Sequence, residues 1–210
     1  MRGAPASYMP ASGFAWTGPY GGLQAAFGFG RGRTTDVGPD AVATRTNGGT
    51  FGAFAGYNHQ FSNNVVAGLE SDVNWANVSG GSTDSSGIAY SNKMNWFGSV
   101  RGRLGYAIGR ALVFATGGVA FAGVDHTIND TPGTTTGLIS FHDTQSGWTA
   151  GAGAEYAITD NLIARAEYRY YDFSGKTYGN TTAGGGSYFW YPHEFQARMQ
   201  TVSAGLAVKF

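Results

Sequence analysis

Apolar and polar residues alternate strictly along the last ten residues of the chain. Val202, Ala204, Leu206, Val208 and Phe210 are apolar, while the residues between them are small or polar. A period of two places successive side chains on opposite faces of a β-strand. A strand of about ten residues with one apolar and one polar face has the length and pattern of a membrane-spanning strand in a closed barrel.

The same alternation recurs upstream, so we expect eight antiparallel strands. In the Gly/Ala-rich fifth segment the facing is ambiguous, and we favour Val113, Ala115, Val119 and Phe121 on the outside. The expected strand segments are 20–29, 51–58, 65–75, 95–106, 111–122, 148–156, 162–170 and 201–210. An even number of short antiparallel strands predicts an all-β, up-and-down transmembrane β-barrel.

Short and long connections alternate between these segments. The short ones, which carry turn-forming residues, are 62–64, 108–110 and 158–161. The long, polar ones are centred near 31–46, 77–93, 123–145 and 174–198. This alternation is typical of bacterial outer-membrane barrels, which have short periplasmic turns and long external loops. It argues against a soluble lipocalin-like barrel, which has no reason to sort its loops in this way and would place its charges outside.

The charged residues of the expected strands share one face. A charge on the lipid face costs roughly 2–4 kcal/mol at the bilayer midplane, so the opposite, aromatic face must meet the lipid. The expected lumenal charges are Glu70, Asp72, Arg101, Arg103, Glu155, Arg165, Glu167, Arg169 and Lys209. The expected lipid-facing aromatic residues are Phe27, Phe29, Tyr57, Trp75, Trp96, Tyr106, Trp148, Tyr156, Tyr168, Tyr170 and Phe210.

The nearly balanced lumenal charges predict a closed interior. Buried charges must be paired, and eight strands enclose a lumen only wide enough for side chains to fill. We therefore expect a barrel plugged by paired charges, with at most a thread of water, and not a wide diffusion pore.

Composition narrows the remaining classes. Glycine accounts for 35 of 210 residues and aromatic residues for 15%, which disfavours disorder and fits many strands joined by turns. The formal net charge of zero gives no indication of nucleic-acid binding. The lack of cysteine excludes disulfides and thiolate metal sites. No apolar run reaches the 18 residues of a transmembrane helix.

The N-terminal residues lack the apolar core of a signal peptide. We interpret the chain as a processed or recombinant mature form, with a flexible tail over residues 1–15 and the barrel over 16–210.

Several motifs together resemble a known family. They lie at 16–22, 56–58, 115–120, 147–156, 166–170 and 205–210. The chain resembles the alphaproteobacterial 25- and 31-kilodalton outer-membrane surface proteins, porin-like barrels of the opacity and OmpA type. The resemblance implies a monomeric eight-stranded barrel in the bacterial outer membrane, in contact with lipid and lipopolysaccharide. It also implies that the terminal aromatic residue is part of the signal read by the barrel-assembly machinery. Pro19 departs from the family pattern, but proline suits a strand start.

Candidate chemistry is sparse. Residues 28–32 have a glycine pattern similar to that of a phosphate-binding loop, but no helix can follow them, so they are interpreted as the exit from the first strand. Ser140, His142 and Asp143 are neighbours in an expected loop that gives no rigid presentation, and His59 lies near a periplasmic turn, in the wrong leaflet for a lipid hydrolase. We therefore predict that the protein is not an enzyme.

The four histidines, His59, His126, His142 and His193, show no metal-ligand spacing. Some relatives in the resembled family bind haem, so a composite loop site from the last three stays an alternative, although no cofactor is predicted. An aromatic group in the last long loop is the candidate for a headgroup belt or for partner docking. It comprises Tyr188, Phe189, Trp190 and Tyr191, with His193 beside it.

The sequence thus predicts a structural and surface-exposed outer-membrane barrel. The first alternative is a surface protein that binds haem, a host molecule or an envelope partner through its loops. The second is a small-solute porin.

Overall fold

The computed structural model describes residues 14–35, 41–83, 89–129, 138–173, 177–178 and 193–210, and every secondary-structure element in them is a β-strand. The strands are β1 (Gly18–Thr35), β2 (Ala41–Gln60), β3 (Val65–Thr83), β4 (Ala89–Ile108), β5 (Ala111–Asn129), β6 (Leu138–Ala157), β7 (Leu162–Phe173), β8 (Thr177–Tyr178) and β9 (His193–Lys209). None of the described residues forms a helix long and apolar enough to cross a membrane.

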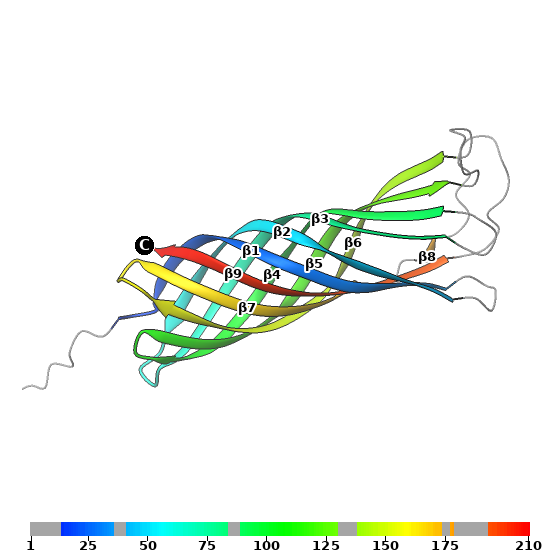
Figure 1. Ribbon diagram of the computed structural model, residues 1–210. Coiled ribbons are helices and arrows are strands. Elements are labelled where there is room, and N and C mark those ends of the chain that lie inside the picture. The colour runs from blue at the N-terminus through cyan, green and yellow to red at the C-terminus, as the bar shows by residue number, and fades with distance from the viewer. Residues whose placement is uncertain (1–13, 36–40, 84–88, 130–137, 174–176, 179–192) are drawn as a thin grey trace, which may run out of the picture.

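The strands close into a barrel, as Figure 1 shows. Each long strand pairs antiparallel with its neighbour in the chain, and β1 pairs with β9 from Tyr20 opposite Lys209 to Thr35 opposite Glu194. Among the described residues, the two-residue β8 pairs only with β9, opposite Glu194 and His193. The wall therefore contains eight strands, β1–β7 and β9, which confirms the predicted fold class.

Most strands are longer than the sequence pattern indicated. Six of them run for 18 to 20 residues where about ten were expected. Much of the segments interpreted as long loops is strand, so their expected limits were wrong: β1 continues to Thr35 and β5 to Asn129. The apolar–polar alternation stops where the lipid contact stops, whereas backbone hydrogen bonds between strands continue into the polar extension.

The three short turns lie together at one end of the barrel, the turn end, with the C-terminus (Figure 1). Asn64 and Gly109 adopt left-handed backbone conformations there, with φ of 65° and 60°, as tight turns require. In the third turn the Thr159 hydroxyl oxygen accepts hydrogen bonds from the backbone N–H groups of Asn161 and Leu162, at 3.3 and 2.9 Å. The opposite end, to which the strands extend, is called the extended end below.

Glycines on the inner face make room for large side chains in the narrow lumen. A Cβ atom at Gly56 would lie 2.5 Å from the Tyr20 hydroxyl oxygen, and one at Gly151 would lie 2.5 Å from Cγ of Arg169. Both distances are too short for non-bonded carbon contacts. The abundance of glycine therefore follows in part from the crowding of an eight-stranded interior.

Candidate functional site in the barrel lumen

A group of eight charged side chains fills the middle of the lumen, and we call it the central network. Strand alternation turns residues two apart toward the same side, so β3, β4 and β7 each contribute more than one member. The members, all buried, are Glu70, Asp72, Arg101, Arg103, Glu155, Arg165, Glu167 and Arg169.

Glu70 pairs with three of the arginines in this network. Arg165 donates two hydrogen bonds to its carboxylate, Nη1 to Oε2 at 2.7 Å and Nη2 to Oε1 at 2.9 Å. Arg101 donates a further one to Oε1, and Arg103 Nη1 lies 3.5 Å from Oε2. The Tyr20 hydroxyl also donates to Oε2, at 2.7 Å. One carboxylate thus holds guanidinium groups from β4 and β7 on different sides of the lumen.

Asp72 and Glu167 extend the network toward the extended end. Asp72 Oδ2 accepts from Arg169 at 2.7 Å and from the Ser99 hydroxyl at 2.6 Å. Glu167 accepts from Arg101 and Arg165, at 2.7 and 2.8 Å. Each of these bonds links side chains that are out of contact with water, where an unpaired charge is costly.

Glu155 pairs with the arginines nearer the turn end. Arg103 Nη2 lies 2.5 Å from Glu155 Oε2, and Arg165 Nε lies 3.8 Å from Oε1. The network therefore contains four carboxylates and four guanidinium groups, with a formal charge of zero. Its interior is compensated without any added ion.

Lys209, the ninth charge expected in the lumen, lies apart from this network. It is half-buried near the turn end, and its Nζ lies 5.4 Å from the centre of the Phe14 ring. Its position at the rim agrees with the expected one, but its nearest described aromatic contact is with the N-terminal segment.

An apolar group, the lower cluster, lies in the lumen between the network and the turn end. Along β7, Ile163 belongs to it and precedes the three charged members on that strand. The buried residues of the lower cluster are Trp16, Tyr20, Phe54, Val66, Ala107, Leu112, Ala157, Ile163 and Ala207. Arg165 lies over the ring of Phe54, 4.6 Å from its centre, so the charged and apolar layers meet through cation–π contacts.

The residues before β1 form part of the lower cluster. Trp16 is only 1% exposed, and its ring meets that of Phe14 edge-on at 4.9 Å. Its backbone N–H donates to Gln60 Oε1 at 2.8 Å, and the Gln60 N–H donates to the Thr17 hydroxyl at 2.9 Å. Phe14, which the sequence placed in the tail, packs against the same cluster. Residues 1–13 lie outside the described part of the chain.

A second apolar group, the upper cluster, lies between the network and the extended end. The Tyr171 ring is edge-on to Phe97 at 5.4 Å and stacked on Phe173 at 6.0 Å. The buried residues of the upper cluster are Phe97, Ala120, Ala122, Tyr171, Phe173 and Met199. Along β7, Tyr171 and Phe173 directly follow the charged residues, so the lumen has three layers: apolar, charged and apolar.

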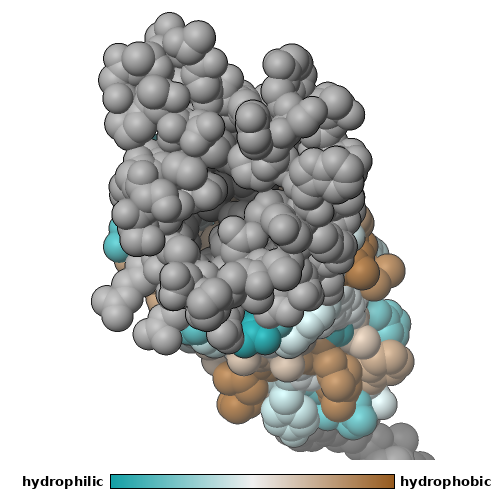
Figure 2. All heavy atoms as spheres, turned by 90° about the vertical axis from the view of Figure 1, so that its right-hand side faces the viewer, coloured by the Kyte–Doolittle hydropathy of each residue, from teal (hydrophilic) through white to brown (hydrophobic). Residues whose placement is uncertain are grey.

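The outer wall carries the predicted aromatic residues. Nine of the eleven are exposed, and Trp96 and Tyr170 are half-buried. Trp96 lies over Gly123, where a Cβ atom would collide with the indole ring. Figure 2 shows apolar side chains on the part of this wall that it displays in colour.

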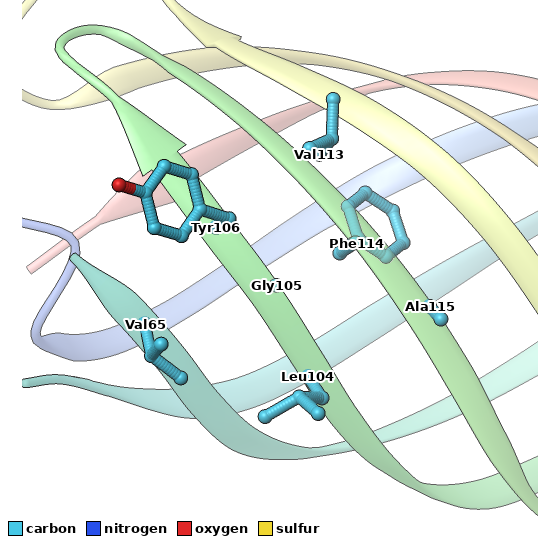
Figure 3. A pocket seen from close by; sticks show the side chains of 7 residues that line it. All are labelled: Val65, Leu104, Gly105, Tyr106, Val113, Phe114 and Ala115. Atoms are coloured by element: carbon cyan, nitrogen blue, oxygen red, sulfur yellow. The ribbon is translucent and has the colours of Figure 1, made fainter. Parts of the chain in front are cut away.

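A shallow apolar groove marks the outer wall near the turn end. Its volume is about 440 Å³, and Figure 3 shows its side chains on β3, β4 and β5. They are Val65, Leu104, Gly105, Tyr106, Val113, Phe114 and Ala115. The groove offers no acid, base or metal ligand. Among the residues whose side chains are described, no three His, Cys, Asp or Glu groups could hold a metal ion together.

The other sequence candidates are placed only in part. The expected loop positions of His126, and of Ser140, His142 and Asp143, were wrong, because they lie in β5 and β6. His59 is exposed on β2 beside a turn, as expected, and packs edge-on against Phe61.

The remaining candidates lie farther along the extended end. Residues 28–32 lie within β1, which continues past them, so they do not mark the end of that strand. His193 begins β9, and its side chain is outside the description. Tyr188, Phe189, Trp190 and Tyr191 fall in a segment that is not described.

Comparison with known proteins agrees with the closed barrel and its apolar wall. Residues 4–210 match the family described as outer membrane protein beta-barrel domain. The chain is 35% identical over 215 residues to the 31 kDa outer-membrane immunogenic protein of Brucella melitensis, covering 96% of this chain and 86% of the relative. The chain belongs to the outer-membrane β-barrel family.

Further relatives of this family are similar over shorter stretches. The 25 kDa outer-membrane immunogenic protein of Brucella canis is 34% identical, covering 83% of this chain and 73% of the relative. The 22 kDa outer membrane protein of Rhizobium leguminosarum is 38% identical, covering 60% and 53%. The predicted membership of the alphaproteobacterial family and the outer-membrane location are thereby confirmed.

Solved outer-membrane barrels share the fold. OprG from Pseudomonas aeruginosa has a TM-score of 0.57 at 12% identity, covering 92% of this chain and 96% of that one. The outer membrane protease OmpT from Escherichia coli has a TM-score of 0.53 at 10% identity, covering 95% and 99%. At such identities the likeness concerns the barrel alone.

Proposed function

We propose that this outer-membrane barrel is a structural and surface-exposed component of the envelope whose lumen is closed to solutes. The single observation that carries the proposal is the three-layered lumen, in which the central network is enclosed by the lower and upper clusters. Solute passage would have to separate paired charges and displace packed aromatic rings.

The energetic argument favours a closed interior over a pore. Breaking a buried ion pair by removing one partner costs about 3–5 kcal/mol, and an ion in transit would have to compete with several such pairs. An apolar constriction also resists wetting. Because a cluster of this kind lies on each side of the network, water meets an apolar layer from either end.

Surface exposure is supported by the relatives, because the 25 and 31 kDa proteins are outer-membrane immunogenic proteins. We infer that the extended end of this barrel faces outward and the turn end faces the periplasm. Labelling of intact cells with an impermeant reagent, using single cysteines at Lys93 and at Asn63, tests this orientation. Only the first site should react, and selective reaction at Asn63 would reverse it.

Conductance in planar bilayers tests the closed lumen. The wild-type barrel should show no stable openings of porin size. A combined Trp16→Ala, Phe97→Ala and Tyr171→Ala variant, which thins both apolar clusters, should conduct more than wild type. A Trp75→Ala, Trp148→Ala variant, altered only on the outer wall, is the matched control and should stay closed. Stable porin-size openings of the wild type would refute the proposal.

A further inference from the structure

Residues 14–17 precede the first strand at the turn end, and we call them the strap. β1 begins at Gly18, and the strand pairs described for the wall do not include the strap. Trp16 is nevertheless only 1% exposed and belongs to the lower cluster. The strap thus fills part of the lumen without being part of the barrel wall.

The other buried residues of the lower cluster line the lumen on every side. Each of the eight wall strands supplies one of them. They are Tyr20, Phe54, Val66, Ala107, Leu112, Ala157, Ile163 and Ala207. Because three of the eight are alanines, the side chains of the wall leave room inside this layer, and the indole ring of Trp16 takes that room.

Hydrogen bonds to one residue of β2 hold the strap at the rim. The Trp16 N–H donates to Gln60 Oε1 at 2.8 Å, and the Gln60 N–H donates to the Thr17 hydroxyl at 2.9 Å. Single hydrogen bonds of this kind contribute little net stability. The strap can therefore separate from Gln60 without the loss of any strand pair in the wall.

Phe14 begins the strap, and Gly18 joins it to β1. The centre of the Phe14 ring lies 5.8 Å from Cζ of Arg110 and 5.4 Å from Nζ of Lys209, and such cation–π contacts are weak where water competes. Gly18 has a φ of 135°, which glycine adopts far more readily than other residues. A glycine at this joint lets the strap change direction while β1 stays in place.

The docked strap leaves polar atoms unsatisfied. Trp16 Nε1 is buried and has no hydrogen-bond partner among the described residues, and the same holds for Oδ1 of Asn58, the residue opposite Gly18. A buried polar group without a partner costs free energy that contact with water would return. A released indole would also be favourable at the membrane–water interface. This cost narrows the free-energy difference between the docked and the released strap.

The buried residues of the upper cluster, in contrast, all lie on wall strands. They come from β4, β5, β7 and β9, so moving one of them out of the lumen would distort the hydrogen-bonded wall. The two ends of the lumen therefore differ. Side chains of the wall fill it near the extended end, whereas a segment outside the wall completes the filling near the turn end.

We propose that the strap is a releasable plug. It leaves the lower cluster while the wall stays paired, and its release opens the lumen from the turn end as far as the central network. The upper cluster stays in place, so the opened lumen is an apolar pocket with a single mouth and not a pore. This inference rests on the proposed closed lumen, because a plug has a role only where the remaining interior is filled.

The test uses single cysteines, since the chain has none of its own. Ala207→Cys reports on the lower cluster and Ala122→Cys on the upper cluster, at alanines that are 2% and 0% exposed. The folded barrel in phosphatidylcholine nanodiscs is treated with methyl methanethiosulfonate, a small neutral thiol reagent, and mass spectrometry follows the modified fraction. With the native strap, Ala207→Cys should react faster than Ala122→Cys.

Gln60→Leu removes the side-chain acceptor of the strap. It should speed modification of Ala207→Cys about fivefold, the effect of one ordinary hydrogen bond on the population of the released state, and leave that of Ala122→Cys unchanged. Gln200→Leu is the matched control, because Gln200 accepts from the Tyr168 hydroxyl on the outer wall, and it should change neither rate.

Phe14→Ala weakens the strap through a different side chain and should also speed modification of Ala207→Cys. Heat-modifiable gel mobility shows that each variant is folded. If neither strap variant speeds this reaction in the folded barrel, the plug is overturned while the closed lumen stands. Equal acceleration at Ala207→Cys and Ala122→Cys would mean that the whole barrel loosens, which also overturns the plug. Rapid modification of both cysteines with the native strap would instead refute the closed lumen on which the plug rests.

Discussion

The central network and the two apolar clusters fill one lumen with opposite chemistry. In the network, Glu70 alone contacts three arginines and a tyrosine hydroxyl. In the upper cluster, Tyr171 packs against Phe97 and Phe173 without any directional bond among them. The network depends on complete pairing, whereas the clusters depend on filled volume.

This difference determines how the stability of each region responds to the loss of a side chain. Loss of one carboxylate removes an ionic partner from several buried guanidinium groups. Small shifts of neighbouring side chains cannot relieve the free-energy cost of these unpaired buried charges. Loss of an apolar side chain leaves a cavity that neighbours partly fill. We therefore expect a single substitution in the network to lower the free energy of unfolding more than a single substitution in either cluster.

The charged and apolar layers are in direct contact at their boundaries. Arg103 lies over the Phe114 ring at 4.0 Å and Arg169 lies 5.7 Å from the centre of the Tyr171 ring. Aromatic faces attract guanidinium groups, so the charged layer ends on rings at each side rather than on aliphatic carbon. The three layers form a continuous packing.

The largest expected effect in the network is that of Glu70→Gln. This change keeps the shape but removes the charge that Arg101, Arg103 and Arg165 share. We expect the free energy of unfolding to fall by about 4–5 kcal/mol, measured by urea titration of the barrel in lipid vesicles with tryptophan fluorescence.

Asp160→Asn is the control for Glu70→Gln. Asp160 pairs with Arg110 in a turn, but its side chain is 82% exposed, so the loss should not exceed about 1 kcal/mol. If the two variants lose similar stability, the buried network has no special role and the contrast between the regions fails.

Trp16→Ala tests the expected smaller effect in the apolar clusters. Trp16 is buried in the lower cluster but precedes the first strand. We expect a loss of about 3 kcal/mol in the free energy of unfolding, at the low end for a buried tryptophan because a terminal segment can readjust. The same urea titration measures it, following gel mobility in place of fluorescence.

Trp75→Ala provides the matched tryptophan on the outer wall, where the side chain is 60% exposed. Its replacement should cost clearly less than that of Trp16, because no internal cavity forms. Equal losses would mean that the N-terminal segment does not close the lumen.

The alternation of charge with apolar residues was sufficient to predict the eight members of the network. Period two assigns residues to a face, and Arg165, Glu167 and Arg169 are spaced accordingly. Period two does not predict which charged side chains form ion pairs across the lumen. Arg165 and Glu70 are 95 residues apart, and their contact depends on barrel closure and strand stagger.

The layering of the lumen was not predictable from alternation alone. Trp96–Phe97 and Tyr170–Tyr171 are adjacent aromatic pairs, so either member could face lipid until the register is known. An irregularity between Met94 and Trp96 locally shifts the pairing of β4. Trp16 belongs to no alternating segment, and neither its burial nor the hydrogen bond from its backbone N–H to Gln60 follows from period two.

The smallest expected effect compares one hydroxyl group in each region. The Tyr171 side chain is fully buried, yet its hydroxyl has no hydrogen-bond partner within the described residues. Tyr171→Phe keeps the ring contacts and removes a polar group that is not hydrogen-bonded. We expect the free energy of unfolding to stay unchanged or to rise by up to about 1 kcal/mol.

Tyr20→Phe is the matched change at the edge of the network, because the Tyr20 ring belongs to the lower cluster but its hydroxyl bonds to two network residues. The Tyr20 hydroxyl donates to Glu70 at 2.7 Å and accepts from Arg103 Nη1 at 3.1 Å. Loss of hydrogen bonds to charged groups should lower the free energy of unfolding by about 1.5–3 kcal/mol. Since both variants lose only an oxygen atom, the difference between them isolates pairing from volume. If Tyr171→Phe proved the more damaging, the upper cluster would depend on a polar contact, and it could not be described as held by packing.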